Sequence, residues 1–373
     1  MVTSTITTSA NLHQASQQWA SRPDDERFLS LEELHAAVAS RRRESWTATP
    51  STSDLRVIPS EGDLAVECFD PAAGERRELA LSHWSFGQLA QYAQAPASYL
   101  RKLPPELAAI NLQWGLERSP IRDNALVLGR SGDEDGAHEL RAMTSTSYGR
   151  IWDQDVVECV QRLNENGRWQ VPAASYAANN PRRATTLYAS DRDVFIFLVD
   201  PENPIELNGE SLFRGFYCWN SEVGSATFGL TTFLYRYVCD NRIIWGATDV
   251  RELKIRHTGG APDRFAYEGV RYLKRYAEES AGKIVEGIQQ AQRLEIPVNA
   301  GKGETVQDWL QARGFTKTEA KGAVDTAIAE EGRARTFWDI AAGISAFART
   351  VPLTDARTTL EAKAGKLMEM ATR

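Results

Sequence analysis

The most regular pattern of apolar and polar positions lies between Ser211 and Trp245. Residues 212–219 alternate with the period of two that is typical of a β-strand. Residues 227–238 repeat the alternation, and their β-branched and aromatic side chains favour a pleated sheet over a helix. A Gly/Ser/Asn turn separates the two runs, and a tight corner at Asp240-Asn241 precedes a third. We predict a three-stranded meander that nucleates the main sheet.

Shorter apolar runs predict further strands on both sides of this meander. Residues 194–199 are apolar at every position, which indicates a central strand covered on both faces. The segment 70–74, Asp-Pro-Ala-Ala-Gly, has the composition of a turn between two strands. The predicted strands outside the meander are residues 55–58, 64–69, 77–81, 125–128, 139–143, 169–176, 185–188, 194–199 and 253–257.

Helical spacing replaces alternation in the rest of the chain. Ser30 and Glu33 form a capping-box pattern ahead of a helix that runs to about Ser40, and residues 41–43 are arginines suited to its negative end. Asp153 is placed to cap a helix through Leu163. Pro262 opens a long helix that ends near residue 297, with one apolar stripe facing the sheet. Further helical spacing covers residues 86–114 and 306–368, and the stripe consists of Val270, Leu273, Ala277, Ala281, Ile284, Ile288 and Ala291.

These elements predict an α+β protein in which a central antiparallel β-meander packs against a long α-helix. An amino-terminal strand and helix region precedes it, and a carboxyl-terminal helical segment follows. The predicted divisions are a flexible tail at 1–22, an amino-terminal α+β region at 23–120, a central sheet and long helix at 121–297, and a carboxyl-terminal helical region at 304–373.

Composition narrows the possible functions. The chain has 373 residues, is 42% hydrophobic and carries a net charge of −7, which argues against coating duplex DNA through an overall positive field. The first ten residues lack a basic start and an apolar run, and the longest apolar run is far too short to span a bilayer. The cysteines are Cys68, Cys159, Cys218 and Cys239, which are far apart and predict reduced, buried thiols. We expect a cytoplasmic protein that does not enter a membrane.

The chain shows no recognisable set of catalytic, metal-ligating or cofactor-binding residues. The histidines never approach the spacing of a zinc pair, and the glycines at 301 and 303 lack the strand and helix context of a phosphate-binding loop. Asp153, Asp155 and Glu158 have the chemistry to hold Mg²⁺ if further acids converge on them, but helix capping explains them more simply. Ser221 fits a turn. We therefore predict no catalytic residue, no metal and no cofactor, and we favour a non-enzyme over an enzyme.

One stretch combines positive charge with aromatic rings. Residues 251–275 contain seven basic and three acidic residues in a chain that is acidic overall, and aromatic residues lie just upstream. Lys and Arg contact phosphates while rings stack on bases, which is the chemistry of sequence-tolerant single-strand binding. The alternative is that the rings fill the core and the charges form a solvated helix face. The predicted phosphate contacts are Arg236, Arg242, Lys254, Arg256, Arg271, Lys274 and Arg275, and the predicted stacking residues are Tyr235, Tyr237 and Trp245.

Three motifs carry a family resemblance. The order LRAMTSTSYGRIWDQDVVECV, WNSEVGSATFGL and YRYVCDNRIIW, followed by a long helix, resembles the phage- and plasmid-associated proteins of domain of unknown function 932. The resemblance extends to RPDDERFLSLEEL and LAQYAQAPASYLRKLP, so we expect it over most of residues 22–373. The family usually has glycine where this chain has Arg242, so the strand register after that corner is not predicted.

The resemblance implies a function at the level of fold analogy. A strand-rich core followed by a long helix is similar to the layout of single-strand annealing proteins such as RecT, Erf and Red beta, which form rings or helices on DNA. The leading expectation is a non-enzymatic, homo-oligomeric protein that binds or anneals single-stranded DNA. The alternative is an oligomeric structural or protein-interaction component of a phage or plasmid, and a third is a Mg²⁺-dependent nuclease that uses Asp153 and Asp155.

Overall fold

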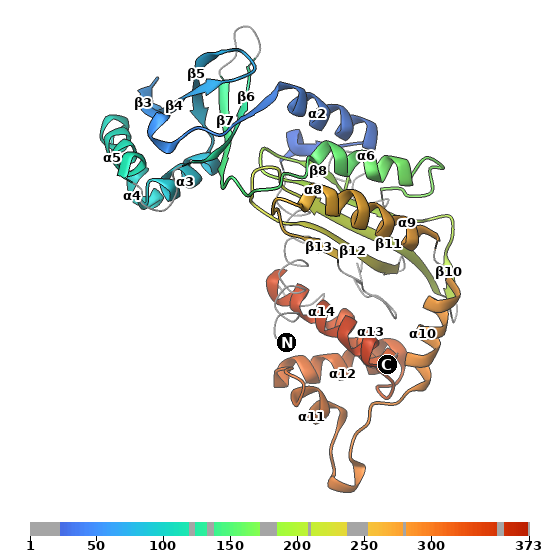
Figure 1. Ribbon diagram of the computed structural model, residues 1–373. Helices are drawn as coiled ribbons and strands as arrows, with labels where there is room; N and C mark the ends of the chain where they lie inside the picture. Colours follow the sequence, from blue (N-terminus) through green and yellow to red (C-terminus); the bar gives the residue numbers. More distant parts are fainter. Residues whose placement is uncertain are drawn as a thin grey trace.

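The structure, a computed structural model, describes residues 23–118, 124–132, 138–171, 185–207, 210–236, 253–278, 281–348 and 354–371. The chain is α+β, as predicted. One mixed sheet with its own helices forms an amino-terminal lobe, a second sheet forms the centre, and a group of helices forms the carboxyl-terminal end (Figure 1). Of the helices described, none is both long and apolar enough to cross a membrane.

The first sheet has six strands in the order β2-β6-β7-β5-β4-β3. All neighbours are antiparallel except β5 and β7, which pair in parallel through Leu79–Leu81. Three helices pack on one face and enclose a core around Leu79, Leu89 and Leu112. The strands are β2 (Ser45–Ala48), β3 (Arg56–Ser60), β4 (Asp63–Asp70), β5 (Glu75–Leu81), β6 (Leu126–Arg130) and β7 (His138–Thr144), and the helices are α3 (His83–Tyr92), α4 (Ala97–Leu100) and α5 (Pro105–Arg118).

The first sheet crosses the division predicted at residue 120. β6 and β7 lie beyond that residue, yet they occupy the middle of this sheet. Conversely, β1 (Arg27–Phe28) precedes the first sheet in sequence but pairs with β8 of the second. The sequence did not reveal that β6 and β7 join the first sheet and β1 the second. A boundary drawn from local composition cannot show which distant strands share hydrogen bonds.

The second sheet has the order β1-β8-β9-β11-β12-β13, with β10 paired to β11 outside this path. The predicted central strand is confirmed, because β9 is buried throughout and lies between β8 and β11. The pairing of β11 with β12 confirms the first hairpin of the meander, whereas the Asp240-Asn241 corner lies outside the described residues. The strands are β8 (Leu187–Ala189), β9 (Val194–Val199), β10 (Ile205–Leu207), β11 (Glu210–Asn220), β12 (Phe228–Arg236) and β13 (Leu253–Ile255).

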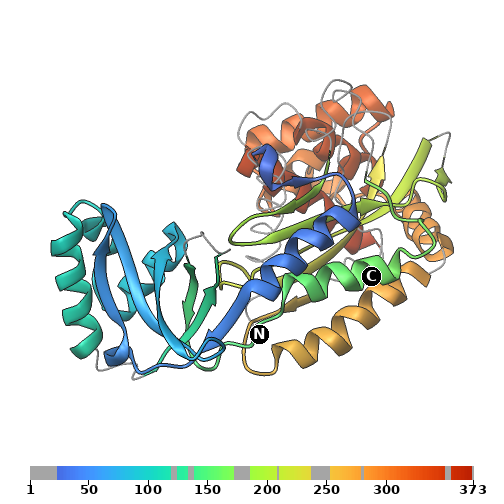
Figure 2. The ribbon, with the colours of Figure 1, turned by 90° about the horizontal axis from the view of Figure 1, so that it is seen from above.

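Three helical segments cover one face of the second sheet (Figure 2). α2 (Leu31–Glu44) begins at Ser30, whose side chain accepts a hydrogen bond from the backbone of Glu33, as its capping-box pattern predicts. α6 (Asp153–Leu163) lies beside α2. The third segment consists of α8 (Ala261–Arg264), a π-helical turn (Phe265–Gly269) and α9 (Val270–Glu278). All three bury apolar residues against β9, β11 and β12.

The opposite face of the second sheet carries a ladder of aromatic rings. Tyr188, Phe195, Tyr217 and Trp219 stack in sequence with ring centroids 5.7–6.0 Å apart, and all are at least 98% buried. Gly229 lies directly across from Trp219 on β12, and a Cβ atom at that glycine would lie 1.9 Å from the indole ring. The glycine is therefore needed so that the ring can lie flat over the neighbouring strand.

The long helix predicted from Pro262 differs from expectation. α10 (Ala281–Arg293) continues it in sequence but joins the carboxyl-terminal helices. Leu273 belongs to the core of the second sheet, whereas Ile288 and Ala291 belong to the carboxyl-terminal core. The predicted single stripe therefore serves two cores, and Val270 is 40% exposed. The other helices of that core are α11 (Val306–Gln311), α12 (Lys317–Glu331), α13 (Phe337–Ala348) and α14 (Thr354–Ala371); short 3₁₀ turns lie at Asp24–Glu26, Thr52–Asp54 and Ala300–Lys302.

Candidate functional site

The loop after β11 connects the second sheet to the first lobe. The loop after β11, Ser221 to Gly224, receives hydrogen bonds from α3 of the first lobe: Trp84 Nε1 and Gln88 Nε2 both donate to the carbonyl of Val223, at 2.9 and 2.7 Å. Ser221 Oγ accepts from the backbone of Val223 and Ser225, so it performs the turn role predicted for it. These contacts join the two sheets through the WNSEVGS motif.

A buried ion pair lies at the centre of this contact. Arg141 of β7 and Glu222 of the loop lie 2.7 Å apart, and their side chains are 3% and 1% exposed. The second Glu222 carboxylate oxygen accepts from the backbone N–H of Asp153 at 2.9 Å, which places a negative charge at the amino-terminal end of α6. Arg150 donates to the Glu222 carbonyl. We call Arg141, Arg150, Asp153, Asn220 and Glu222 the junction cluster.

Asp153 does not cap α6, contrary to the sequence-based expectation. Its side chain is buried and accepts a hydrogen bond from Asn220 Nδ2 at 2.8 Å, and the Glu222 carboxylate accepts from the Asp153 backbone N–H. Burial, followed by the charge of Glu222, raises the pKa of Asp153 well above its ordinary value. The reason for the error is tertiary, because Glu222 comes from a strand end 69 residues away.

The predicted pair of acids does not converge. Asp155 points away from the cluster and pairs with Arg42 of α2, and Glu158 bonds to His35 of the same helix. Among the residues that the structure describes, no group of three or more His, Cys, Asp or Glu side chains is arranged to hold a metal ion. The geometry therefore gives the nuclease alternative no support.

A stack of rings and guanidinium groups borders the junction cluster. Arg42 lies 5.0 Å from the Trp152 ring centroid, Arg150 lies between Trp152 and Tyr148, and Tyr148 stacks on His257 at 5.0 Å. His257 Nδ1 donates to the carbonyl of Gly149 at 3.1 Å. The stack therefore joins α2, the loop before α6 and the segment after β13.

His257 gives the junction a measurable pH dependence. Burial lowers the pKa of His257 to about 4, so the folded chain binds its proton less well than the unfolded chain. Its contribution to stability is present above pH 6.5 and is lost as the pH falls toward 4. We expect the loss at pH 5 to be about 2 kcal/mol, and to be absent in His257→Phe. Urea unfolding of both proteins at pH 7 and pH 5 measures it; equal slopes against pH would contradict the assignment.

The junction cluster is closed to ligands. Its four ionisable side chains belong to residues that are at most 8% exposed, and their bonds connect β7, α6 and the loop after β11. Such a site fits the role of fixing two sheets relative to each other. A binding surface must be sought where charge and rings reach solvent.

A groove of about 380 Å³ lies between α6 and α9. Its floor includes Trp169 and Leu273, each 2% exposed. Three cations and one carboxylate line it: Arg162 from α6, Arg168 from the segment after it, and Lys274 and Glu278 from α9. Arg168 is held by the buried carboxylate of Asp200. An apolar floor with cations around it suits a ligand that has a flat apolar part and negative charge.

The exposed side of α9 and of the π-helical turn before it extends this groove. Tyr267 is 67% exposed, and Arg271 Nη1 donates to its hydroxyl at 3.1 Å while its guanidinium lies 5.9 Å from the ring. Val270, on the next turn, is 40% exposed and lines the groove. Tyr267, Arg271 and Lys274 follow one another at spacings of three and four residues, so they form one stripe on the helix. We call the groove and this stripe the α6–α9 surface.

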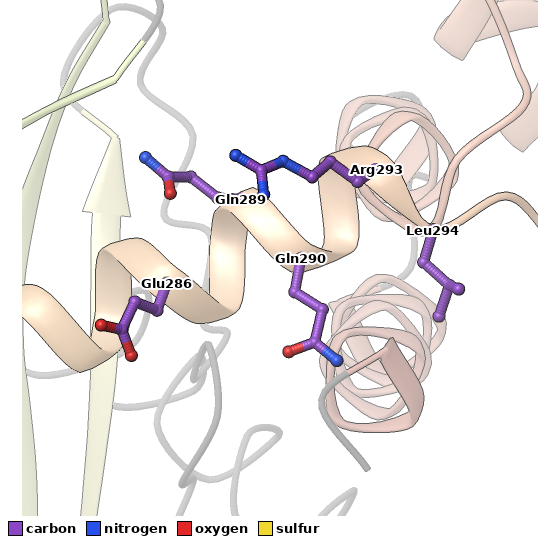
Figure 3. A pocket seen from close by; sticks show the side chains of 5 residues that line it. All are labelled: Glu286, Gln289, Gln290, Arg293 and Leu294. Carbon is purple, nitrogen blue, oxygen red and sulfur yellow. The ribbon is translucent and has the colours of Figure 1, made fainter.

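A second hollow, of about 400 Å³, lies along α10 (Figure 3). Its labelled lining consists of Glu286, Gln289, Gln290, Arg293 and Leu294, all from one helix or its end. One carboxylate and one guanidinium give it no dominant charge, and no aromatic ring is among these residues. It therefore offers less for recognition than the α6–α9 surface.

Comparison with known families connects both features. Residues 140–296 match the family model described as Domain of unknown function (DUF932). This DUF932 region begins within β7 and ends after α10, so it contains the junction cluster and the α6–α9 surface. The match is narrower than the resemblance expected from the sequence. Searches of the curated proteins and of the solved structures found no match, so the expected likeness to RecT, Erf and Red beta has no support from a solved structure.

The DUF932 region brings together some of the predicted phosphate contacts. Arg271, Lys274 and Arg275 are all exposed on α9. Arg256 is exposed just after β13. Lys254 is separated from the α9 residues, because Leu253 and Ile255 on the same strand pack under α9 and alternation turns Lys254 to the other face of the sheet.

Of the predicted stacking residues, only Tyr235 lies within the described residues, and only its place in a strand is described. Tyr235 and Arg236 lie at the end of β12, opposite Phe213 and Leu212 of β11, while Tyr237, Arg242 and Trp245 lie outside the described residues. Phe216, Tyr217 and Trp219 of β11 are buried, whereas Phe213 is partly exposed. For the buried rings the core explanation is the correct one.

Sequence reasoning missed Tyr267, Arg162 and Arg168. A signal for Tyr267 was present, because it precedes Arg271 by one helical turn within the basic stretch. Nothing in the sequence linked Arg162 and Arg168 to that helix, since α6 and α9 are about a hundred residues apart and meet only through packing on the same sheet.

Proposed function

We propose that this protein binds single-stranded nucleic acid, DNA in the first instance, along the α6–α9 surface. The observation that carries the proposal is Tyr267, a large ring that is 67% exposed beside a cation and next to a basic groove. Exposing a large ring to water is unfavourable, and a base that stacks on the face of the ring would cover it. The role is that of a non-enzymatic protein that holds or anneals strands.

The arrangement suits a strand lying along α9. One base stacks on Tyr267, Arg271 and Lys274 contact successive phosphates, and the apolar floor beside Val270 accepts a neighbouring base, with Arg162 on the far side of the groove. The chain carries a net charge of −7, but salt screens charges that are more than about 10 Å away. Acidic residues far from the α6–α9 surface therefore weaken phosphate binding there only slightly.

Existing ion pairs on this surface do not prevent phosphate binding. Lys274 lies 3.9 Å from Glu278, and Arg162 lies 3.6 Å from Glu158, and all four side chains are at least 35% exposed. Exposed pairs of this kind are weak and exchange readily with water. A phosphate group can therefore replace the carboxylate as the partner of the lysine.

Tyr267→Ala is expected to weaken binding of a fluorescein-labelled oligothymidylate by about 5- to 150-fold, because stacking on one base contributes about 1–3 kcal/mol. Fluorescence anisotropy at low salt measures the change. Tyr99→Ala on α4 is the matched control, because Tyr99 is 57% exposed but lies in the first lobe. Its affinity should equal that of the wild type.

The salt dependence of the same titration tests the phosphate contacts. Lys274→Gln should reduce the slope of log affinity against log salt concentration by about 0.7, the value for one phosphate contact on a single strand. Arg56→Gln is the control, since that side chain is 68% exposed and also paired with a carboxylate. Absence of binding at low salt, or an affinity that ignores salt, would refute the proposal.

A further inference from the structure

Arg168 is held in a fixed position in the wall of the groove of the α6–α9 surface. The segment that carries it is tied to β9, because Gln170 and Val199 exchange two backbone hydrogen bonds of 2.8 and 2.9 Å. Arg168 Nε donates to a carboxylate oxygen of Asp200, and the guanidinium lies 5.2 Å from the centroid of the Trp169 ring. The backbone and the side chain of Arg168 are therefore both fixed, although the side chain is still 21% exposed.

Asp200 is the residue that fixes this guanidinium. It follows β9 directly and is completely buried. Its carboxylate accepts hydrogen bonds from the backbone and side-chain nitrogens of Asn203, at 3.2 and 2.9 Å, and lies 3.8 Å from Arg214 Nη2. A carboxylate bound on several sides cannot turn toward solvent, so it keeps the guanidinium of Arg168 in one orientation.

The other two cations of the groove are suited to phosphates. The side chains of Arg162 and Lys274 are 69% and 71% exposed, and each pairs only weakly with a carboxylate one turn away on its own helix. A long, exposed cation can follow a phosphate group, whereas a guanidinium of fixed direction can bond to the edge of a base. Arg168 therefore differs in kind from the cations that contact phosphates.

The fixed polar groups beside Arg168 are donors. Trp169 is 2% exposed and lines the groove, and its Nε1 has no hydrogen-bond partner within the described part of the chain. Of the acceptors nearby, Asn166 Oδ1 already accepts from the backbone N–H of Arg168 at 3.2 Å, and Glu278 is 66% exposed and paired with Lys274. A buried donor without a partner is unfavourable, and an acceptor on a ligand would offset that cost.

We propose that this groove selects keto bases, with Arg168 reading the base edge and Asp200 acting as its positioning residue. The inference rests on the proposed binding of single strands. Guanine, thymine and uracil carry a keto oxygen where adenine and cytosine carry an amino group. A guanidinium donates to the keto oxygen, whereas an amino group would bring its own hydrogens against the donors of this wall. The apolar floor of the groove supports the plane of the base.

The test compares oligodeoxyuridylate with oligodeoxycytidylate of equal length, because their rings have the same size but carry a keto and an amino group respectively. Fluorescence anisotropy at low salt should show the uridylate bound about fivefold or more tightly, the lower end of the range for one base contact. Arg168→Lys keeps the charge but loses the planar fork, so it should remove the difference. Arg162→Lys, the same change on an exposed cation of the same groove, is the matched control and should preserve it.

Asp200→Asn tests the positioning role. The preference for uridylate should fall, while the slope of log affinity against log salt concentration stays that of the wild type, because no phosphate contact is lost. Circular dichroism verifies that each variant folds. Equal binding of the two oligonucleotides by the wild type, or an Arg168→Lys variant that retains the preference, would overturn base selection and leave single-strand binding intact. A wild type that binds neither would overturn both.

Discussion

Glu222→Ala is expected to lower the free energy of unfolding by about 3–5 kcal/mol, because it leaves a buried cation without its partner. Arg141, whose side chain is 3% exposed, loses its carboxylate, and the first backbone N–H of α6 loses its acceptor. Both lost interactions lie where the two sheets meet. The lower free energy of unfolding should appear as a lower midpoint in urea unfolding.

A double-mutant cycle separates this effect from simple loss of packing. Replacing Arg141 and Glu222 together by methionine removes both charges. The double variant should therefore be more stable than Arg141→Met or Glu222→Met alone. Glu268→Ala is the control, because its pair with Arg264 is exposed and its loss should leave the unfolding midpoint nearly unchanged. A double variant less stable than both single variants would show that the pair is not the source of the effect.

Gly229→Ala is expected to destabilise the second sheet by about 1–3 kcal/mol, the usual cost of adding volume to a packed core. The added Cβ atom would lie 1.9 Å from the Trp219 ring, so the ring must leave its place in the aromatic ladder. Thermal unfolding followed by tryptophan fluorescence measures both the loss of stability and the altered environment of the ring.

The first sheet provides an independent copy of this arrangement. Gly129 lies across from Trp46, and a Cβ atom there would lie 2.3 Å from the indole, so Gly129→Ala should have a similar cost. Gly259→Ala is the control, because the nearest atom to its added Cβ is 4.0 Å away. Because Gly→Ala reduces the entropy of the unfolded chain, the control should cost little or should stabilise the fold; a control that costs as much as Gly229→Ala would contradict the role of the ring contact.

The correct predictions were those in which the signal is local. Alternation over residues 212–219 identified β11, a fully apolar run identified β9 as a covered strand, and Ser30 with Glu33 marked the start of α2. The thiols of Cys68, Cys159 and Cys218 are buried, as predicted, and burial raises the pKa of the first two to about 11; Cys239 lies outside the described residues.

The incorrect or incomplete predictions share one cause. The apolar positions from Val270 to Ala291 keep helical spacing throughout, so the sequence gives no sign that two different cores divide them. Asp153 has the sequence context of a cap, and it is buried because a distant glutamate takes that role. Lys254 belongs to the basic stretch, but strand alternation separates it from the α9 cations.

The sequence by itself determined the kinds of element, the covered strand, the helix start at Ser30 and the concentration of positive charge near residues 251–275, because each depends on the chemistry of neighbouring residues. Tertiary structure alone decided which strands share a sheet, which acids are buried at the junction, and that Tyr267 joins Arg162 and Arg168 across two helices. Those outcomes depend on contacts between residues far apart in the chain, whose partners are fixed by burial and pairing over the whole fold.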